Sequence, residues 1–242
     1  QQEILFSIRS VIRYFVDIGN VYIVTDGQTP LFLGNLLNRV KIIDHREIFS
    51  NMEFLPSFNS HAIASNLHRI PGLKEHYLYL NDDIIFASAV SAANFFDEYG
   101  RSFQFVSSAA CLPGMAKEFG EIAANAAGIN NRRLLSEKMG IYAFRKYKHT
   151  ALPTLRSVME QMERDLPEAW AATLPNKFRS DSDFSIAGSL YQNYASAKGK
   201  AVRGSIRYGY YNTANPGSIN DAKELLRSDW VRPQIFCIND TI

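Results

Sequence analysis

The sequence predicts an α/β domain, with a mainly parallel sheet flanked by helices and a helical insertion in the second half of the chain. Helix and strand patterns alternate over residues 4–43, and this alternation is typical of parallel strands joined by crossover helices. The apolar run over 77–86 is interrupted by Asp82 and Asp83, as at the end of a buried strand. From residue 91 onward helical patterns predominate, and strand patterns return only near the C-terminus.

The elements of the first half follow from apolar spacing and from turn residues. Residues 4–16 place apolar side chains three and four positions apart and precede Gly19, which predicts an amphipathic helix. The strand expected over 21–24 stops at a Thr-Asp-Gly turn. The remaining expected elements are a helix over 31–37, a strand over 40–43, a loop over 44–60, a helix over 61–69 and the strand over 77–86.

The second half is expected to be mainly helical. Pro153 suits the first turn of a helix, and Gly128 suits a break between two helices. The expected elements are a short helix over 91–96, a strand over 102–107, two helices within 115–138, helices over 154–164 and 183–197, and strands over 200–203 and 234–238. We therefore expect one domain with an α/β core over 1–110, a mainly helical region over 111–199 and a return to the core sheet over 200–242.

Composition excludes several classes of protein. An apolar fraction of 46% in 242 residues is that of a globular domain, and no apolar run approaches the roughly 20 residues of a membrane span. The formal net charge of +2 gives no argument for nucleic-acid binding, although Lys and Arg are frequent from Arg132 onward. Cys111 and Cys237 stand far apart and form no CxxC pattern, which favours a reducing compartment.

Two acidic residues with an amide beside them follow the expected central strand. Asn81, Asp82 and Asp83 would lie at the sheet edge where α/β proteins bind ligands. Mg²⁺ and Mn²⁺ prefer such oxygen ligands and share them with phosphates. The alternative is a surface turn, because the same three residues are good turn formers. Asn239 and Asp240 repeat the pair after a later strand, so the two pairs can converge on one cation.

A histidine in a basic loop is the candidate general base. His149 follows the cations of residues 145–148 and precedes Pro153. Neighbouring cations lower the pKa of a histidine, so we expect His149 to be neutral near about pH 7, as a general base must be. The alternative is an ordinary surface histidine.

Other cations suit a phosphate group. Arg179 lies just ahead of a helix that Asp181 or Asp183 would cap, and its guanidinium fork matches phosphate oxygens. His68 and Arg69 end a helix just before the acidic strand, where they could face whatever the acids hold. The alternatives are a solvated capping loop and a helix C-terminus at which cations are favoured in any case.

Several motifs are absent from the sequence. Its five histidines form no HExxH or other metal-ligand spacing, and there is no GxxxxGK, GxGxxG or GxSxG segment. A zinc site, a kinase, a Rossmann dehydrogenase and a serine hydrolase therefore lose support.

Four segments of the first half resemble the second conserved block of the Stealth proteins, in the same order and spacing. These segments are Asn20–Pro30, Leu55–Ser60, Leu67–Leu73 and Tyr79–Asp83. The segments similar to the third block are His149–Pro153 and Lys177–Asp183, and Cys237–Asp240 is similar to the start of the fourth. The Stealth proteins are hexose-1-phosphate transferases of bacterial capsule synthesis, related to the animal enzyme that adds GlcNAc-1-phosphate to lysosomal glycoproteins.

The resemblance implies a Rossmann-like or GT-A-like fold and a sugar-1-phosphate transferase. The enzyme would move a hexose 1-phosphate, expected to be N-acetylhexosamine 1-phosphate, from a UDP-sugar to a sugar hydroxyl, forming a phosphodiester and releasing UMP. The resemblance further implies Mg²⁺ or Mn²⁺ as cofactor and an oligosaccharide or capsule polymer as acceptor. We expect a cytoplasmic location, with peripheral attachment to the inner face of the bacterial membrane as an option. Nucleic acid is not an expected partner, and the sequence leaves the oligomeric state open.

The resemblance also implies roles for individual residues. His149 would be the catalytic base, Arg179 would bind the diphosphate, and Asp83 would act in the metal and phosphate site. The implied metal ligands are Asp82, Asp83 and Asp240. The residues expected to bind substrate are Gln28, Asn59, His68, Arg69, Asn81 and Lys177.

One departure concerns the front of the chain. The family's first block, a strand ending in Trp-Val-Asn/Asp-Gly that helps to hold the nucleotide, is absent, so we expect a piece of a longer enzyme that is cut at both ends. Two alternatives stay open. One is a metal-dependent glycosyltransferase that uses a nucleotide sugar, and the other is a non-catalytic glycan-binding module in which Tyr208, Tyr210 and Tyr211 stack on sugars.

Overall fold

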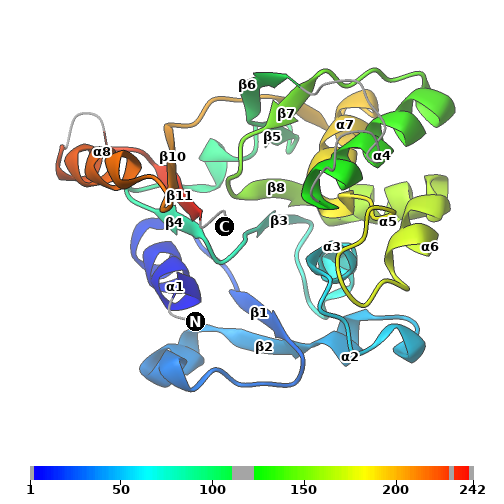
Figure 1. Ribbon diagram of the computed structural model, residues 1–242. Coiled ribbons are helices and arrows are strands. Elements are labelled where there is room, and N and C mark those ends of the chain that lie inside the picture. The colour runs from blue at the N-terminus through cyan, green and yellow to red at the C-terminus, as the bar shows by residue number, and fades with distance from the viewer. Residues whose placement is uncertain (1–2, 111–122, 229–231, 240–242) are drawn as a thin grey trace.

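The computed structural model describes residues 3–110, 123–228 and 232–239 and has a mixed α/β architecture (Figure 1). The helices are α1 (Glu3–Tyr14), α2 (His45–Ile48), α3 (Ser60–Ala64), α4 (Ala123–Met139), α5 (Arg156–Asp165), α6 (Pro167–Thr173), α7 (Tyr191–Ala197) and α8 (Pro216–Arg227). Shorter 3₁₀ or π segments are Leu31–Arg39, Met52–Phe54, Leu67–Arg69, Ala92–Asn94 and Ile186–Leu190. No helix in the described ranges is long and apolar enough to cross a lipid bilayer.

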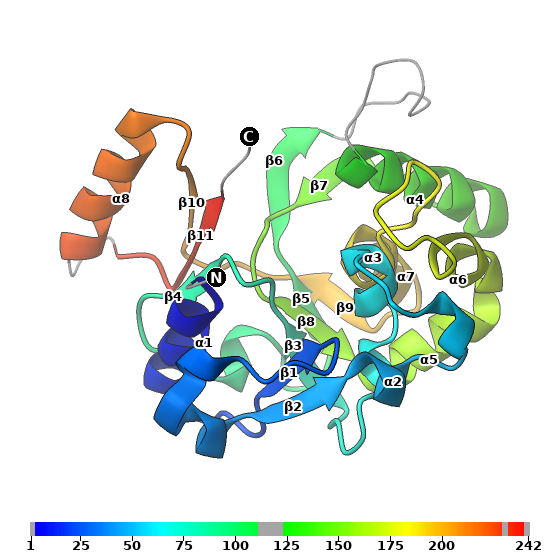
Figure 2. The same cartoon turned by 60° about the horizontal axis from the view of Figure 1, so that its bottom comes forward.

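The strands form a central region with helices on both sides. They are β1 (Tyr22–Thr25), β2 (Lys41–Asp44), β3 (His76–Tyr79), β4 (Ile84–Phe86), β5 (Ser102–Gln104), β6 (Val106–Ala110), β7 (Arg145–Tyr147), β8 (Leu152–Leu155), β9 (Ala201–Arg203), β10 (Tyr208–Asn212) and β11 (Ile235–Asn239). Figures 1 and 2 show α1 and α8 on one side of this region and α3 to α7 on the other. The predicted α/β class is confirmed.

The strands pair in several small sheets. Within the described ranges, β1–β2, β5–β9 and β10–β11 are parallel pairs, whereas β3–β8, β4–β11 and β6–β7 are antiparallel. The arrangement is therefore more mixed than the mainly parallel sheet expected from the sequence. Alternation along the chain correctly indicated the β1–β2 pair, but β3 and β4 pair with strands from the second half, which local patterns cannot reveal.

The apolar run over 77–86 forms two strands instead of one. β3 ends at Tyr79, β4 begins at Ile84, and the acidic residues lie between them. Because β3 pairs with β8 and β4 pairs with β11, this turn carries the chain from one sheet to another. The acidic residues thus lie in a turn, as one alternative predicted, and also at the ends of two strands, as the other predicted. Side chains from neighbouring strands can reach them there.

Two expectations about helices in the second half, a break at Gly128 and a helix start at Pro153, are wrong. α4 continues through Gly128, where the fully buried Ala126 and Ala127 offset the helix penalty of glycine, which is about 1 kcal/mol. The part of the expected helices at 115–122 lies outside the described residues. Pro153 lies inside β8, opposite Leu78, and does not start a helix; α5 begins at Arg156.

Three loop and helix expectations in the rest of the chain also need correction. The expected loop over 44–60 contains α2, whose first turn is fixed by a capping box between Asp44 and Glu47. The expected helix over 31–37 is a 3₁₀ segment that bends at Gly34, where φ is 46°. Asp183 does not cap a helix, because the following segment starts at Ile186 and Asp183 itself is fully buried.

Two hydrophobic clusters hold these elements together. The larger one packs α5, α6 and α7 around Met159, Trp170 and Tyr191, all of which are 3% exposed or less. The second packs α1 against β4 and β11. Here hydroxyl groups assist, because Ser7 Oγ donates to the carbonyl of Ile84 at 2.7 Å in a buried contact. The position of α1 therefore fixes β4 and the acidic turn that precedes it.

We expect Tyr191→Phe to destabilise the protein by about 1–3 kcal/mol. The fully buried hydroxyl oxygen of Tyr191 accepts the backbone N–H of Leu155 at 2.8 Å, so its removal leaves a buried donor without a partner at the end of β8. Urea unfolding followed by circular dichroism measures the change. Tyr142→Phe is the matched control, because Tyr142 is 70% exposed. Equal unfolding midpoints for the two variants would contradict the prediction.

Candidate functional site

Asp83 lies at the meeting point of three parts of the chain. Its Oδ2 atom is 3.0 Å from Nε2 of His149, which comes from the turn between β7 and β8. From β11, Sγ of Cys237 approaches the same oxygen at 3.1 Å and Nδ2 of Asn239 at 3.3 Å. The backbone N–H of Ile238 donates to the carbonyl oxygen of Asp83 at 3.1 Å. Main-chain and side-chain contacts together hold this carboxylate in one place.

The hydrogen bonds around Asp83 determine which groups carry protons. Burial alone would raise the pKa of Asp83, but the hydrogen bond and charge of His149 and the hydrogen bonds from β11 outweigh burial and lower that pKa. Because Asp83 is then an anion, the hydrogen of a neutral His149 ring lies on Nε2, and in that tautomer Nδ1 is the basic ring atom. Burial and the adjacent carboxylate raise the pKa of Cys237, so this residue is a thiol that donates to Asp83.

The cations just before His149 do not surround its ring as the sequence suggested. Arg145 donates from Nη1 to the carbonyl oxygen of Ser108 at 3.0 Å. Lys148 reaches the carbonyl oxygen of Ile206 at 3.4 Å. The imidazole instead hydrogen bonds to a carboxylate, and its side chain is 41% exposed. Long side chains leave a loop in different directions, so proximity in sequence did not give proximity in space.

A divalent ion that prefers oxygen fits the groups around Asp83. Asp83, His149 and Cys237 offer ligand atoms within 4.8 Å of one another. Oδ1 of Asn239 is buried and has no hydrogen-bond partner in the described part of the chain, while its Nδ2 donates to Asp83. A carboxylate and an unpaired amide oxygen suit Mg²⁺ or Mn²⁺, whereas a protonated thiol does not suit a hard cation.

The other acidic and amide residues of the expected site lie in different places. Asp82 is exposed, and Nδ2 of Asn81 is 3.3 Å from Nε2 of His149. Asn81 and Asp82 both line one cavity, together with Tyr79 and Ser60. Asp240 lies outside the described residues.

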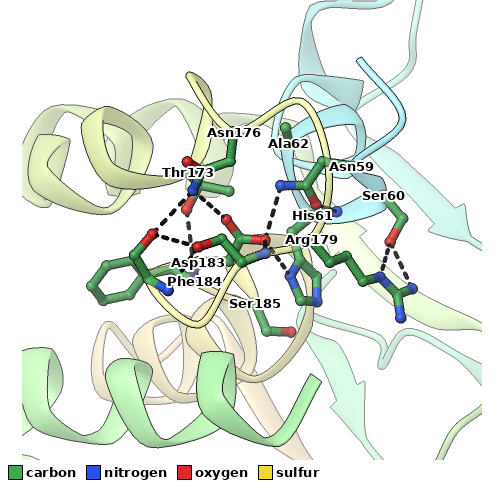
Figure 3. A network of polar contacts seen from close by, with 12 residues as sticks. Asn59, Ser60, His61, Ala62, Thr173, Asn176, Arg179, Asp183, Phe184 and Ser185 are labelled. Carbon is green, nitrogen blue, oxygen red and sulfur yellow. Dashed lines mark hydrogen bonds and ion pairs between the residues drawn. The ribbon is translucent and has the colours of Figure 1, made fainter. Parts of the chain in front are cut away.

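A second carboxylate, that of Asp183, organises the loop that carries Arg179 (Figure 3). Asp183 is fully buried and joins this loop to the start of α3. Its hydrogen-bond partners are Nδ2 of Asn59 at 2.9 Å, Nδ1 of His61 at 3.2 Å, Nδ2 of Asn176 at 2.7 Å and the backbone N–H of Ser180 at 3.0 Å. Removal of this carboxylate would leave several buried donors without an acceptor.

Arg179 faces the same region as the acidic turn. Its Nε and Nη2 donate to Oγ of Ser60 at 2.9 and 2.7 Å, at the N-terminus of α3 (Figure 3). Burial raises the pKa of Tyr79 to about 12, and the charge of Arg179 opposes this shift while those of Asp82 and Asp83 add to it. Arg179 and the two acidic residues therefore act electrostatically on one hydroxyl group.

Two residues expected to bind substrate have hydrogen-bond partners within the protein. Nζ of Lys177 donates to the carbonyl oxygens of Glu53 and Leu55, both at 2.8 Å. Asn59 is fully buried, where Oδ1 caps α3 by accepting the N–H of His61 and Nδ2 donates to Asp183. These contacts tie both side chains to the segments on either side of the Arg179 loop.

Three further expected residues do not meet Asp83. Nε2 of His68 is 3.0 Å from Glu163, and Arg69 forms an ion pair with the same carboxylate at 2.5 Å. His68, Arg69 and Glu163 line a different cavity from that of Asp82. Gln28 has an exposed side chain, and its carbonyl oxygen accepts the hydroxyl of Thr25 at 2.9 Å.

The tyrosines considered as a stacking surface are not jointly exposed. Tyr210 is 47% exposed and Tyr211 is 6% exposed, while Tyr208 is half-buried. All three belong to β10, where alternate side chains point to opposite faces. β10 therefore offers one open aromatic ring in place of a three-ring platform.

Sequence reasoning missed Cys237 and Asp183 as members of these networks. A single cysteine in an apolar strand looks like ordinary core, although the Asn-Asp pair that follows did point to the end of β11. Asp183 looked like a helix cap, because an acidic residue just before a helical pattern can either cap the helix or be buried, and the local sequence does not distinguish the two. Only the contacts across the fold separate these cases.

Comparison with known proteins gives two family matches. Residues 1–104 match the model of conserved region 2 of the Stealth proteins, and residues 148–196 match the model of conserved region 3. Together these two regions cover more than half of the chain. The first contains the acidic turn and the second contains both His149 and Arg179.

Several curated proteins are similar over the whole chain. Exopolysaccharide phosphotransferase SCO6023 of Streptomyces coelicolor is 41% identical over 100% of this chain and 41% of its own length. Capsular polysaccharide phosphotransferase fcs1 of Haemophilus influenzae is 33% identical over 99% of this chain and 66% of its own length. The chain thus spans less than half of the first of these relatives.

A solved structure shares the fold. The apo form of mouse xyloside xylosyltransferase 1 superposes with a TM-score of 0.50, covering 97% of this chain and 90% of that chain. The sequence identity is 10%, so the likeness concerns the fold alone, and it agrees with the GT-A-like expectation.

We expect the free energy of unfolding to fall as the pH is lowered from about 7 to about 5.5, partly because of His61. Burial lowers the pKa of His61, while the contact with Asp183 opposes this shift. The unfolded chain therefore takes up a proton below about pH 6.5 that the native state resists, and stability is lost as pH falls through that range. Urea titrations at several pH values measure the slope.

The variant His61→Gln is expected to show a shallower slope over the same pH range. A second variant, His45→Gln, should also flatten it, because burial lowers the pKa of His45 as well. An unchanged slope in both variants would contradict the assignment.

Proposed function

Because this chain belongs to the Stealth protein family, we propose that it carries the catalytic site of a polysaccharide phosphotransferase that moves a hexose 1-phosphate from a UDP-sugar to a sugar hydroxyl. N-acetylhexosamine 1-phosphate is the group that we expect to be transferred, and UMP is the expected leaving group. The observation that carries the proposal is the convergence of His149, Asp83 and Asn239 in one oxygen-rich site. Phosphoryl transfer depends chiefly on positioning and on neutralisation of charge, and these groups are suited to both.

In the proposed reaction the acceptor hydroxyl oxygen attacks the β-phosphorus of the donor. A new phosphorus–oxygen bond forms to the acceptor, and the bond between the β-phosphorus and the bridging oxygen breaks, so that UMP leaves with that oxygen. Nδ1 of His149 takes the proton of the acceptor hydroxyl. Asp83 holds the ring by accepting the hydrogen on Nε2 at 3.0 Å, which keeps the basic nitrogen in one orientation.

Arg179 is the proposed partner of the donor diphosphate. Its contact with Ser60 uses Nε and one Nη2 hydrogen, and a guanidinium group has further donors that match phosphate oxygens. The buried Asp183 network holds the backbone of the Arg179 loop, so this charge is positioned before the substrate arrives.

Mg²⁺ or Mn²⁺ is the proposed cofactor. When bound, such an ion neutralises the charge of the diphosphate. Asp83 and Oδ1 of Asn239 are the described groups that would hold it, with Asp82 and Asp240 as further proposed ligands. Cys237 would not be a ligand in this arrangement, since its thiol donates to Asp83.

A metal-dependent glycosyltransferase is the second candidate function. The observation that favours it is the fold shared with mouse xyloside xylosyltransferase 1. Both reactions can use a UDP-sugar and a divalent ion, but they break different bonds. A glycosyltransferase breaks the bond to the sugar carbon and releases UDP, whereas the proposed phosphotransferase breaks a bond to phosphorus and releases UMP.

Product analysis tests the proposal directly. The protein is incubated with Mg²⁺, a panel of UDP-sugars and an oligosaccharide acceptor, and the released nucleotide is identified by chromatography. We expect UMP and a phosphodiester resonance in the phosphorus NMR spectrum of the product, and loss of both when EDTA removes the ion. UDP and a product without phosphorus would contradict the phosphotransferase assignment and support the glycosyltransferase.

We expect His149→Ala to lower kcat by about 10²- to 10⁴-fold, because the acceptor hydroxyl loses its base. Asp83→Asn should also lower kcat, because Nε2 of His149 loses its anionic partner. His76→Ala is a matched control, since His76 is an exposed histidine that bonds to the carbonyl oxygen of Gly100 and not to the site. Near-normal kcat in His149→Ala, with an unchanged melting temperature, would exclude its role as base.

A further inference from the structure

A cavity of about 540 Å³ lies between α5 and the 3₁₀ segment Leu67–Arg69 with the turn that follows it. This volume is within the range of small-molecule sites, which is about 300–1,000 Å³. Four charged residues line it from α5 and share one helix face, because they are three or four positions apart. They are Arg156, Glu160, Glu163 and Arg164. The opposite face of α5 is buried in the larger hydrophobic cluster, so this wall of the cavity is held in place from behind.

The cavity is separate from the proposed catalytic site. Asp83, His149 and Arg179 are not among the residues that line it. Figures 1 and 2 both show α5 on one side of the β3–β8 pair and the β4–β11 pair, beside which Asp83 lies, on the other. A ligand bound against α5 therefore does not occupy the position of the reacting groups.

Three arginines and two glutamates line the cavity, which leaves one positive charge in excess when its histidine is neutral. Arg69 forms an ion pair with Glu163 at 2.5 Å, and Nη1 of Arg156 forms one with Glu160 at 2.7 Å. The guanidinium of the third arginine, Arg164, has no hydrogen bond or ion pair within the described residues. The charge of Arg164 is therefore available to an anionic ligand.

Two buried nitrogen atoms of the lining residues have no hydrogen-bond partner in the described part of the chain. One is Nε of Arg156, an N–H donor. The other is Nδ1 of His68, whose side chain is only 2% exposed. A buried polar atom without a partner costs free energy, so a ligand that supplies the partners of these two atoms recovers that cost on binding.

The contact between His68 and Glu163 determines what Nδ1 can bind. Burial raises the pKa of Glu163, but the hydrogen bonds and charges of His68 and Arg69 outweigh burial and lower that pKa. Because Glu163 is then an anion, the hydrogen of a neutral His68 ring lies on Nε2, which is 3.0 Å from the carboxylate. Nδ1 is in that case an acceptor. The cavity thus offers an acceptor for a hydroxyl group together with donors for an anionic oxygen.

These features select the ligand by its chemistry. A guanidinium fork matches the oxygens of a phosphate group, so Arg156 and Arg164 suit a phosphate. A phosphodiester carries one negative charge, which equals the excess of the cavity, whereas a phosphomonoester carries about 1.5 to 2 at about pH 7. A sugar hydroxyl beside the phosphate supplies the donor that Nδ1 of His68 lacks. Sugars joined by a phosphodiester offer both groups.

We propose that this cavity is a second, non-catalytic site that binds a phosphodiester between two sugars of the chain that the enzyme extends. Arg156 and Arg164 bind the phosphate oxygens, and His68 accepts a hydroxyl of an adjoining sugar. Ile70 and Leu73 give apolar surface for the C–H groups of that sugar. The identity of the ligand rests on the proposed function, because that reaction forms such phosphodiesters. The site holds a part of the polymer that is already made, so a long acceptor binds at two places at once.

Calorimetric titration of the complete gene product, without a donor, tests the proposal independently of turnover. The probe is two hexoses joined by one phosphodiester, and we expect a neutral disaccharide and a hexuronic acid to bind at least about 10-fold more weakly than the probe. Equal affinity for either of them would overturn the proposal. Equal affinity for inorganic phosphate would make free phosphate the ligand and contradict the assignment to a glycan. Loss of probe binding in saturating UDP would place the probe at the catalytic site instead.

Two variants test the residues. Arg164→Gln is expected to weaken binding of the probe by about 10- to 100-fold, because a charge-assisted contact is lost. Arg156→Lys keeps the positive charge but removes Nε, and should also weaken binding. Arg227→Gln is the matched control, since it removes an exposed arginine from α8. Unchanged affinity in both cavity variants, at unchanged melting temperature, would refute the proposed site.

Transfer to acceptors of increasing length gives a second readout. We expect kcat/KM of the unsubstituted protein to rise with acceptor length, and this rise to be lost in Arg164→Gln, because only a long chain reaches both sites. A rise that persists in the variant would overturn the role of the cavity in holding the acceptor. Probe binding without turnover of any UDP-sugar would contradict the proposed function and leave the phosphodiester site standing, whereas turnover without probe binding would do the reverse.

Discussion

A carboxylate that is largely removed from water must be matched by hydrogen-bond donors, and at the partly buried Asp83 this requirement joins parts of the chain that are far apart in sequence. The donors are His149 before β8 and the side chains of β11, while Asp83 itself links β3 to β4. The β3–β8 pair and the β4–β11 pair are thus connected at one side chain. The same contacts lower the pKa of Asp83 and orient the imidazole, so the features that stabilise this junction also suit the proton transfer that we propose for it.

The need to match a buried carboxylate with donors also fixes the loop that carries Arg179, through Asp183. Its carboxylate is fully buried and accepts hydrogen bonds from Asn59, which caps α3, and from the loop that precedes Ile186. Lys177 adds to this by binding two backbone carbonyl groups of the segment before α3. Arg179 is left on the exposed side of a loop that is otherwise fixed. A rigid loop lowers the entropy that is lost when an arginine binds a diphosphate, which is the benefit of preorganisation.

The prediction from sequence was most accurate where structure is local. The amphipathic pattern of residues 4–16 became α1, and the strand expected over 234–238 became β11, because side-chain periodicity directly reflects which face is buried. It was wrong at Pro153 and at Gly128, where the tertiary environment outweighs local preference. Pro153 is tolerated in β8 because its partner position requires no donor, and that position depends on β3.

For the site, the sequence by itself determined the residue types: acidic residues with an amide at a strand end, a histidine, an arginine ahead of a structured segment, and the blocks of the Stealth family. Tertiary structure decided which of them meet. In the folded chain His149 and Cys237 contact Asp83. By contrast, His68 and Arg69 pair with Glu163, and Lys177 donates to backbone carbonyl oxygens. The physical reason is that a partly buried charged side chain pairs with the opposite charge or hydrogen-bonding group that lies beside it in the folded chain. These neighbours come from segments distant in sequence, so no local pattern identifies them.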